Sequence, residues 1–372
     1  MSSIRNWTHD MAASLARRAP RLRNAMLGVR EAAQVAQHSL ARHAPALIRA
    51  NTTNLTVAMT ARCTHRCQGC LYERGFMAGQ QLSRDVLEQL VDDAAELGVR
   101  SIRLYGGEPL LHPDLAHIVR RAVDRGLRTY VTTNGVLLEQ KIDELFEAGL
   151  RDLTFGYYGT HDAYDQYVER PGAYARLERG IATVRERYGE AVALRMNWLL
   201  MRPTCTVAAL QQAVDFARRY DTPMQIDLVH YSLPYFTEGP EKELQFRAED
   251  RPQIDAVVAE LLRIRREEPH RIDTSDIGLR AIPDWLLKGP DMKVPCDKYR
   301  MVWIGADGTV QLCYVTYRLG NLNEQRLREL LYTDTHHAAA RDAFRLTCPN
   351  CHCGYDDRTR KHLPSRRRYA GD

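Results

Sequence analysis

Three cysteines near residue 65 form the most chemically distinctive group in the chain. Cys63, Cys67 and Cys70 are spaced C-x3-C-x2-C in the stretch ARCTHRCQGCLYERG, and no fourth cysteine follows nearby. A closed structural zinc site uses four protein ligands, so it would need His65 as the fourth. An iron–sulfur cluster held by three thiolates instead leaves one iron open to bind a small molecule. The spacing favours this open site, with structural zinc or a buried cysteine cluster as alternatives.

Five of the nine cysteines lie in the last quarter of the chain. The stretch from 291 to 357 that holds them is loop-rich and has little apolar periodicity. Such a segment usually needs a metal to hold it together. The five are Cys296, Cys313, Cys348, Cys351 and Cys353. Separated cysteine pairs of this kind hold iron–sulfur clusters and also zinc ribbons, so the sequence predicts a second metal site without deciding the metal.

The elements that must position these cysteines follow a βα pattern from residue 51 onward. Short apolar or β-branched runs alternate with longer helical patterns at a spacing of about 25 residues. The predicted strands are LTVAM (55–59), SIRLY (101–105), RTYVTT (128–133), RDLTF (151–155), AVALRMNWLL (191–200) and MQIDLV (224–229). Parallel strands joined by crossover helices form an open doubly wound sheet or a full or partial barrel. In each case the chemistry gathers at the carboxyl ends of the strands.

Helix signals separate the predicted strands. Ser83 is the expected N-cap of a helix over 84–97, and Gly98 stands where the end of that helix needs a left-handed residue. Helical patterns recur between the later strands, and one more amphipathic helix is expected over 253–268.

The cysteine array on the loop after the first strand resembles the cluster loop of the radical S-adenosylmethionine (radical SAM) enzymes. In that family the open iron chelates the amino and carboxylate groups of S-adenosylmethionine, and an electron from the cluster splits its sulfonium bond to give a 5′-deoxyadenosyl radical. The resemblance covers roughly residues 55–230 and implies an α/β fold, a partial (βα)6 barrel. It also implies a [4Fe–4S] cluster on Cys63, Cys67 and Cys70, with S-adenosylmethionine as the remaining ligand.

The ends of the next two strands match further elements of the family. YGGEP resembles its Gly-Gly-Glu element, so Gly106 and Gly107 would expose backbone to the methionine moiety and Glu108 would accept from its ammonium group. TTNG ends the third strand where the family contacts the ribose, and Asn134 is the candidate there. A plain turn is the alternative in both places, since Asn-Gly is a common turn pair.

Other positions depart from the family pattern or match it weakly. Gly69 stands before the third cysteine, where the family often has an aromatic residue that holds adenine. The fourth strand lacks the usual Ser-x-Asp-Gly turn and reads LTFGYYGTHDAYD. Arg170 is a candidate carboxylate contact, and Asn197 on the fifth strand is a candidate cofactor contact. A polar strand residue that faces a helix is the alternative for Asn197.

The later cysteines resemble the auxiliary-cluster modules called SPASM and twitch domains. Gly308 precedes Cys313 by the Gly-x4-Cys spacing of these modules, and ADGTV suits a hairpin turn. Five cysteines fall short of the seven or more of a two-cluster domain, so the resemblance implies one auxiliary [4Fe–4S] cluster. The predicted ligands are Cys296, Cys313, Cys348 and Cys351, because the pair in CPNC can share one cube. Cys353 is the expected spare.

Cys205 lies outside both cysteine groups, immediately after the fifth predicted strand. There it would belong to the loop layer over the carboxyl ends of the strands, on the face that should hold the cofactor. It could then donate a hydrogen atom to a substrate radical, as cysteines do in some related radical epimerases. The alternative is a small buried side chain, which is common for a free cysteine.

Charge is distributed unevenly and marks the two ends of the chain. Of the net charge of +5, residues 1–50 carry +6 and residues 358–372 carry +5, so the middle is acidic and nucleic-acid binding is not expected. The head is expected to be a packed or solvated helix, with a transit peptide or an anionic-surface helix as alternatives. The tail is expected to be partly disordered. The predicted segments are 1–50, a core at 51–235, a helical linker at 236–290, the auxiliary domain at 291–357 and the tail at 358–372.

The chain also carries signals of its compartment. It has no run of eighteen apolar residues and no secretory signal, so no membrane span and a cytoplasmic location are expected. An odd number of cysteines makes metal or redox chemistry a better interpretation than a disulfide framework.

The resemblance implies an enzyme that abstracts a hydrogen atom from a polar, natural-product-type small molecule, with oxidation, epimerisation, dehydration or rearrangement as the outcome. Its electron donor would be a flavodoxin or ferredoxin. A SPASM-type maturase of a ribosomal peptide is one alternative, although residues 1–50 lack the β-rich pattern of a fused peptide-recognition domain. A non-catalytic iron–sulfur or zinc scaffold or electron carrier is another, and the Gly-Gly-Glu element argues against it.

Overall fold

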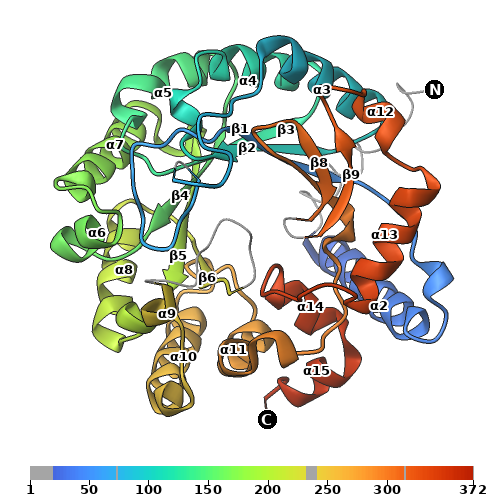
Figure 1. Ribbon diagram of the computed structural model, residues 1–372. Helices are drawn as coiled ribbons and strands as arrows, with labels where there is room; N and C mark the ends of the chain where they lie inside the picture. Colours follow the sequence, from blue (N-terminus) through green and yellow to red (C-terminus); the bar gives the residue numbers. More distant parts are fainter. Residues whose placement is uncertain (1–19, 73, 232–240, 314–315, 372) are drawn as a thin grey trace.

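The computed structural model describes residues 20–72, 74–231, 241–313 and 316–371 (Figure 1). Within these residues nine strands form one sheet in the order β6-β5-β4-β3-β2-β1-β7-β8-β9. The first six strands pair in parallel. They are β1 Asn54–Thr60, β2 Ser101–Gly106, β3 Arg128–Thr133, β4 Asp152–Tyr157, β5 Ala193–Leu200 and β6 Met224–Leu228. All six predicted strands are confirmed, each within two residues at either end.

A layer of helices covers the outer face of the curved sheet (Figure 1). These helices are α3 Arg84–Glu96, α4 Leu115–Asp124, α5 Leu138–Glu147, α6 His161–Tyr167, α7 Ala173–Tyr188 and α8 Val207–Arg219. The predicted ends of α3 are confirmed: the Ser83 hydroxyl accepts from the Val86 N–H at 3.3 Å, and Gly98 has a φ of +75°. Apolar side chains from the strands' outer face, such as Leu55 and Val57, are fully buried against this layer. The strand alternation therefore leaves the more polar set facing inward.

The cysteine-rich C-terminal part contributes three strands to the same sheet. β7 Met301–Ile304 pairs in parallel with β1, and β8 Thr309–Leu312 and β9 Tyr317–Asn321 follow as antiparallel neighbours. Gly308 has a φ of +84° in the turn between β7 and β8, so the predicted hairpin is confirmed. No sequence feature indicates that this hairpin joins the core sheet, because β7 and β1 are distant in the chain and pair only in the folded protein.

Seven further α-helices of the described residues follow β6 along the chain, and most of them flank the open side of the curved sheet (Figure 1). These are α9 Glu241–Leu244, α10 Arg251–Glu267, α11 Asp276–Lys288, α12 Leu327–Leu330, α13 Asp334–Arg345, α14 Tyr355–Lys361 and α15 Leu363–Arg368. The Tyr355 hydroxyl donates to the Ile226 carbonyl of β6 at 3.0 Å. The Trp285 indole N–H donates to the Thr359 hydroxyl, also at 3.0 Å. α11 and α14 therefore pack together at the edge of β6.

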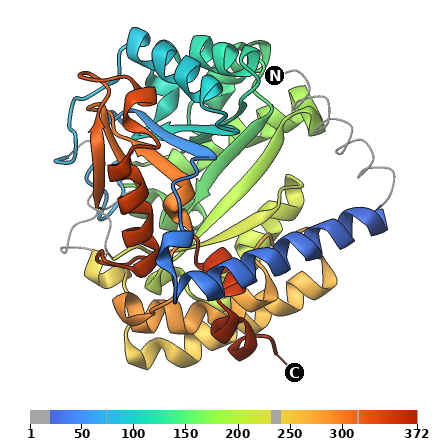
Figure 2. The same cartoon turned by 90° about the vertical axis from the view of Figure 1, so that its right-hand side faces the viewer.

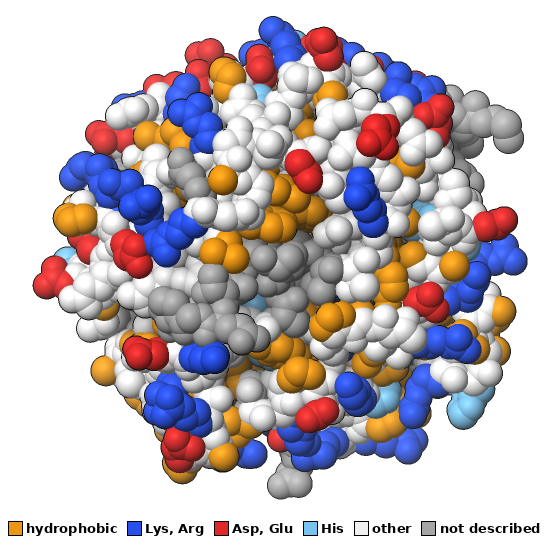
Figure 3. Space-filling model, in the orientation of Figure 1, with side chains coloured by type: hydrophobic (Ala, Val, Ile, Leu, Met, Phe, Trp, Pro, Cys, Tyr) orange, Lys and Arg blue, Asp and Glu red, His pale blue; other side chains and the backbone are white. Residues whose placement is uncertain are grey.

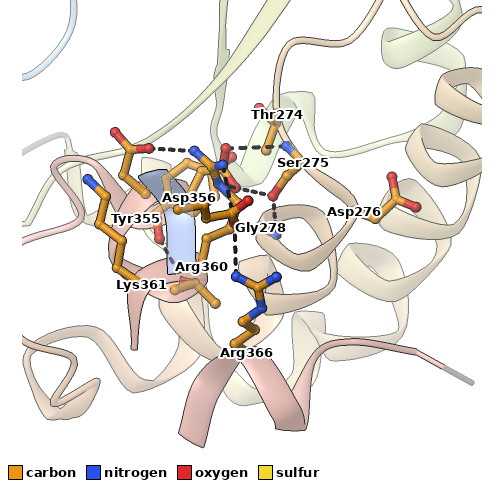
Figure 4. Close-up of polar contacts among 12 residues, drawn as sticks. Thr274, Ser275, Asp276, Gly278, Tyr355, Asp356, Arg360, Lys361 and Arg366 are labelled. Atoms are coloured by element: carbon orange, nitrogen blue, oxygen red, sulfur yellow. Dashed lines mark hydrogen bonds and ion pairs between the residues drawn. The ribbon is translucent and has the colours of Figure 1, made fainter. Parts of the chain in front are cut away.

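α14 is fixed to the N-terminus of α11 by one carboxylate (Figure 4). Asp356 accepts from the Ser275 hydroxyl and from the Ser275 N–H, and the same hydroxyl caps α11 by accepting from the Gly278 N–H at 3.0 Å. A side chain at Gly278 would collide with the Asp356 carboxylate, since an added Cβ would lie 2.2 Å from its Oδ1. Glycine is therefore required for this close approach.

The expectation of a partly disordered tail is wrong for residues 358–371. This segment completes α14 and forms α15, and its Arg358 side chain is fully buried. The reason is tertiary: carbonyl groups and one aromatic ring from other segments surround a side chain that no local periodicity marks as internal.

The basic head is helical from Pro20, as α2 Pro20–Ala41, and lies beside the C-terminal helices (Figure 2). Glu31 pairs with Arg366 at 3.0 Å and with Arg360 at 3.8 Å, and Ala41 is fully buried. The predicted helix thus packs on the body, while residues 1–19 lie outside the described part. Among the described residues, no helix is both long and apolar enough to cross a membrane.

Candidate active site

The inner face of the sheet borders a cavity of about 1710 Å³. Its walls include cysteines of the first group at one place and Cys353 of the second at another. Seen from the side drawn in Figure 3, hydrophobic side chains gather toward the middle of the face and charged ones lie mostly around it. The cavity therefore joins both cysteine-rich regions to one interior space.

The loop after β1 presents the first cysteine group. Cys63, Cys67 and Cys70 all line the cavity. A backbone hydrogen bond fixes this loop to the end of α6: the Gln68 N–H donates to the Tyr167 carbonyl at 2.9 Å. Burial, followed by the charges of the other two cysteines, raises the pKa of the Cys67 thiol well above its usual range. Metal binding must therefore displace a proton here.

Gly106 and Gly107 line the cavity and also touch the start of the cysteine loop. The Gly107 N–H donates to the Thr60 carbonyl and the Glu108 N–H to the Arg62 carbonyl, both at 2.8 Å. A Cβ added at Gly107 would lie 2.3 Å from the Arg62 carbonyl oxygen, and one at Gly106 would lie 2.3 Å from that of Thr60. The two glycines are thus needed to bring the end of β2 against the loop, whatever ligand the exposed backbone meets.

Glu108 lies behind the cavity wall instead of facing the cavity. Its side chain is fully buried, and its carboxylate accepts from the Leu110 N–H at 3.0 Å, the Thr133 hydroxyl at 2.8 Å and the Asn134 N–H at 2.8 Å. Burial raises its pKa to about 7. Its acceptance from the ammonium group of the cofactor stays a prediction, and the observed contacts give it a different task, which is to fix the end of β3.

Asn134 and Arg170 converge on the cysteine loop at Thr64, a residue that the sequence analysis did not single out. The Asn134 amide donates to the Thr64 hydroxyl at 2.8 Å and to the Cys63 sulfur at 3.9 Å. The Arg170 guanidinium donates to the Thr64 carbonyl at 3.0 Å. Both side chains line the cavity, so two predicted cofactor residues lie beside the predicted cluster.

Asn197 lies on the far wall of the cavity and contacts another polar residue that the sequence analysis missed. Its amide donates to the Asp227 carboxylate of β6 at 2.5 Å, while its buried Oδ1 has no hydrogen-bond donor among the described residues. His230, just past β6, also lines this wall. On β2, Arg103 faces the same space and donates to the Thr132 hydroxyl at 2.9 Å. For Asp227 and Arg103, the signal that could have found them is their alternate position along strands whose other face is apolar.

All five C-terminal cysteines line a second, smaller space. The CPNC loop is shaped by Asn350, which has a φ of +66° and whose amide donates to the Pro290 and Met292 carbonyls at 3.0 and 3.1 Å. Cys353, the expected spare, lines this space as well as the barrel cavity. Which four cysteines bind metal stays a prediction, but Cys353 stands between the two sites.

Cys205 lies in the hydrophobic core and is not among the residues that line the cavity. Its side chain is fully buried, and burial raises the pKa of its thiol to about 12. This position favours the alternative of a buried structural side chain over that of a hydrogen donor.

The donor sets fit iron–sulfur clusters in composition and position. Within the described part of the chain, no three His, Cys, Asp or Glu side chains are arranged around a single metal ion. A four-iron cluster places each thiolate on a different iron, so its ligands surround a cube instead of converging on a point. Three cysteines at the cavity and five around the second space can meet that requirement.

Comparisons with protein families agree with both regions. A model of the radical SAM superfamily matches residues 57–204, and a model of the SPASM iron–sulfur cluster-binding domain matches residues 296–353. Over 153 residues the chain is 37% identical to a GTP 3′,8-cyclase of Chlorobaculum tepidum. The aligned part covers 41% of this chain and 42% of that protein. Over 146 residues it is 33% identical to an AdoMet-dependent heme synthase of Methanosarcina barkeri, covering 39% and 40%. The chain spans about half the length of the curated relatives it matches.

Solved structures show the same fold over more of the chain. anSMEcpe with bound AdoMet superposes with a TM-score of 0.60 at 16% identity, covering 79% of this chain and 81% of that one. Streptococcus suis SuiB superposes with a TM-score of 0.58 at 15% identity, covering 90% and 78%, and has also been solved with precursor peptide SuiA. These likenesses concern the fold, and they confirm the predicted partial barrel with its C-terminal cysteine-rich region.

Proposed function

Because the chain belongs to the radical SAM superfamily and carries a SPASM iron–sulfur domain, we propose that it cleaves S-adenosylmethionine reductively and abstracts a hydrogen atom from a polar, hydroxyl-bearing small molecule. The observation that carries this proposal is the single cavity bordered by the three-cysteine loop, by Cys353 and by polar side chains of the barrel strands. A substrate held there lies between the two cysteine-rich regions.

The residues around the first cluster have separable tasks. Cys63, Cys67 and Cys70 would hold a [4Fe–4S] cluster, and that cluster would supply the electron for the reductive cleavage of S-adenosylmethionine. Asn134 and Arg170 hold the loop at Thr64 and leave polar groups beside it. Gly106 and Gly107 keep the end of β2 against the loop.

The opposite wall of the cavity supplies the groups for a polar substrate. The buried Asn197 Oδ1 has no donor within the part of the chain that the structure describes, and Asp227 beside it is a hydrogen-bond acceptor. Burial lowers the pKa of His230, so its imidazole is neutral near pH 7 and offers one donor and one acceptor. Hydroxyl groups satisfy such a mixture of donors and acceptors better than an apolar ligand does.

The test uses anaerobically reconstituted protein and a panel of polyhydroxylated compounds and peptides. Asp227→Asn is expected to reduce substrate-dependent turnover while leaving the slow cleavage of S-adenosylmethionine without substrate. Asp273→Asn is the matched control, because that carboxylate forms an exposed ion pair with Arg195. The small-molecule proposal would be contradicted if no hydroxylated compound stimulated cleavage and the Asp227→Asn variant behaved like the parent.

Modification of a peptide is the second candidate, and the fold shared with SuiB, which has been solved with a precursor peptide, favours it. The same assay separates the two, since a peptide substrate would stimulate cleavage and gain or lose mass. A third candidate, a non-catalytic iron–sulfur or zinc protein, predicts no binding of S-adenosylmethionine in a calorimetric titration. A flavodoxin or ferredoxin would supply the electron, and a cytoplasmic location would keep the nine cysteines reduced.

A further inference from the structure

Arg358 is a fully buried cation beside the second cysteine group. It lies on α14, in the segment whose composition predicts a disordered tail, and it lines the small space shared by the five C-terminal cysteines. Its guanidinium carbon stands 4.6 Å from the ring centre of Trp285. A charged side chain at such depth is costly unless something compensates its charge.

The guanidinium ties together the two chain segments that carry the cysteines. Its Nη1 donates to the Cys351 carbonyl at 2.6 Å, and its Nη2 donates to the Val294 carbonyl at 2.5 Å and to the Asn350 Oδ1 at 3.0 Å. Val294 is two residues before Cys296. One side chain thus fixes the approach to Cys296 against the CPNC loop.

These contacts leave the charge and the Nε–H of Arg358 unused. Its Nε is buried and has no hydrogen-bond acceptor among the described residues. Neighbouring cations on α14 have carboxylate partners, Arg360 with Asp357 at 2.6 Å and Lys361 with Asp297. Arg358 forms no ion pair with a carboxylate in the described part of the chain, and its hydrogen bonds are to neutral acceptors. The five C-terminal cysteines line the same small space as Arg358.

Thiolates on an iron–sulfur cluster carry net negative charge and accept hydrogen bonds at sulfur, and both features set the reduction potential of the cluster. We propose that Arg358 is a positioning residue for the auxiliary cluster: it holds the two ligand-bearing segments together, donates its Nε–H to a ligand sulfur, and raises the reduction potential through its positive charge. The cluster site compensates the buried cation, and the cation in turn favours the reduced cluster.

The test compares Arg358→Gln and Arg358→Lys in a Cys63/Cys67/Cys70→Ala background, which isolates the auxiliary cluster. Iron is counted after reconstitution, and the midpoint potential is measured by a redox titration followed by electron paramagnetic resonance. The neutral Arg358→Gln variant is expected to reduce the ratio of reduced to oxidised cluster at a fixed potential by at least tenfold, which is about 59 mV for a one-electron couple. Arg358→Lys keeps the charge and is expected to stay within about threefold of the parent (about 28 mV on the same scale).

Arg366→Gln is the matched control, because Arg366 belongs to the same C-terminal segment but pairs with Glu31 and does not line the cysteine space. It is expected to leave the potential unchanged. An Arg358→Gln protein with full iron and an unshifted potential overturns the proposal. If Arg358→Gln fails to load iron, the Arg358→Lys variant decides the question. A tenfold fall in its ratio of reduced to oxidised cluster would also overturn the proposal. A parent with no auxiliary iron would instead contradict the presence of the auxiliary cluster, which is a separate failure.

Discussion

Replacement of Gly107 by alanine perturbs the contact between the end of β2 and the cysteine loop. An added Cβ would lie 2.3 Å from the Arg62 carbonyl oxygen and 2.5 Å from that of Ala61, and both belong to backbone immediately before Cys63. Backbone cannot rotate away as a flexible side chain can. The loop must therefore move by about 1 Å before the methyl group reaches ordinary van der Waals distance.

The size of the effect follows from what that movement breaks. The Gly107 N–H loses its bond to the Thr60 carbonyl and the Glu108 N–H its bond to the Arg62 carbonyl, both 2.8 Å long. Each lost bond costs about 1 kcal/mol, and the residual overpacking costs about 1–2 kcal/mol. The free energy of unfolding of the metal-free protein should fall by about 3–4 kcal/mol. A displacement of about 1 Å at the site of chemistry should also reduce cleavage of S-adenosylmethionine by about a hundredfold.

The assay pairs urea unfolding of the metal-free protein with chromatographic measurement of 5′-deoxyadenosine after reconstitution. Gly75→Ala is the control, because Gly75 lies in the same loop and an added Cβ there would have no atom of the described residues within 4 Å. It should match the parent in both assays. A Gly107→Ala protein that unfolds and cleaves like Gly75→Ala would refute the steric argument.

Three further predictions concern buried groups. Burial raises the pKa of Glu108 from 4.5 to about 7 in the folded protein, so Glu108 ionises at lower pH in the unfolded chain than in the folded one. The free energy of unfolding should therefore fall by about 3 kcal/mol as the pH rises from 4.5 through 7. Glu108→Gln should remove this pH dependence of urea unfolding. Asp93→Ala should cost about 1–3 kcal/mol in the same assay, because a fully buried carboxylate pairs with two partly exposed cations, Arg326 and Arg328, each at 2.6 Å. Cys205→Ala should retain the wild-type product and solvent-deuterium incorporation, since the thiol lies in the core outside the cavity.

Each of these has an outcome that contradicts it. A Glu108→Gln protein with the parent's pH dependence would mean that another group titrates. For Asp93, the control is Asp273→Ala at an exposed ion pair, which should cost less than about 1 kcal/mol; equal losses would show that burial does not matter. Loss of reduced product in Cys205→Ala, with 5′-deoxyadenosine still formed, would restore the hydrogen-donor role.

Local signals predicted the core of the fold well. Six strands, the Ser83 cap and the turn at Gly308 follow from patterns a few residues long, because burial of one strand face and helix-end hydrogen bonding are decided nearby. The three-cysteine loop was predicted from its spacing, and the residues at the next two strand ends from their resemblance to the family's motifs.

What the sequence could not predict depends on partners distant in the chain. The pairing of β7 with β1 joins residues about 250 apart in sequence, and neither strand has a local pattern that indicates its partner. Arg358 looked like one charge of a solvated tail, since its acceptors lie at Val294, Asn350 and Cys351. The role of Glu108 in fixing the end of β3 likewise depends on folding, because its carboxylate accepts from Thr133 and Asn134 only in the folded protein.

The central claim is that Cys63, Cys67 and Cys70 hold the cluster that cleaves S-adenosylmethionine. The most direct measurement is the yield of 5′-deoxyadenosine from the anaerobically reconstituted Cys63/Cys67/Cys70→Ala variant with a chemical reductant, with iron counted in the same sample. We predict no 5′-deoxyadenosine above background and a loss of about four irons per chain, with the spectrum of the auxiliary cluster retained. Formation of 5′-deoxyadenosine at the wild-type rate would contradict the account.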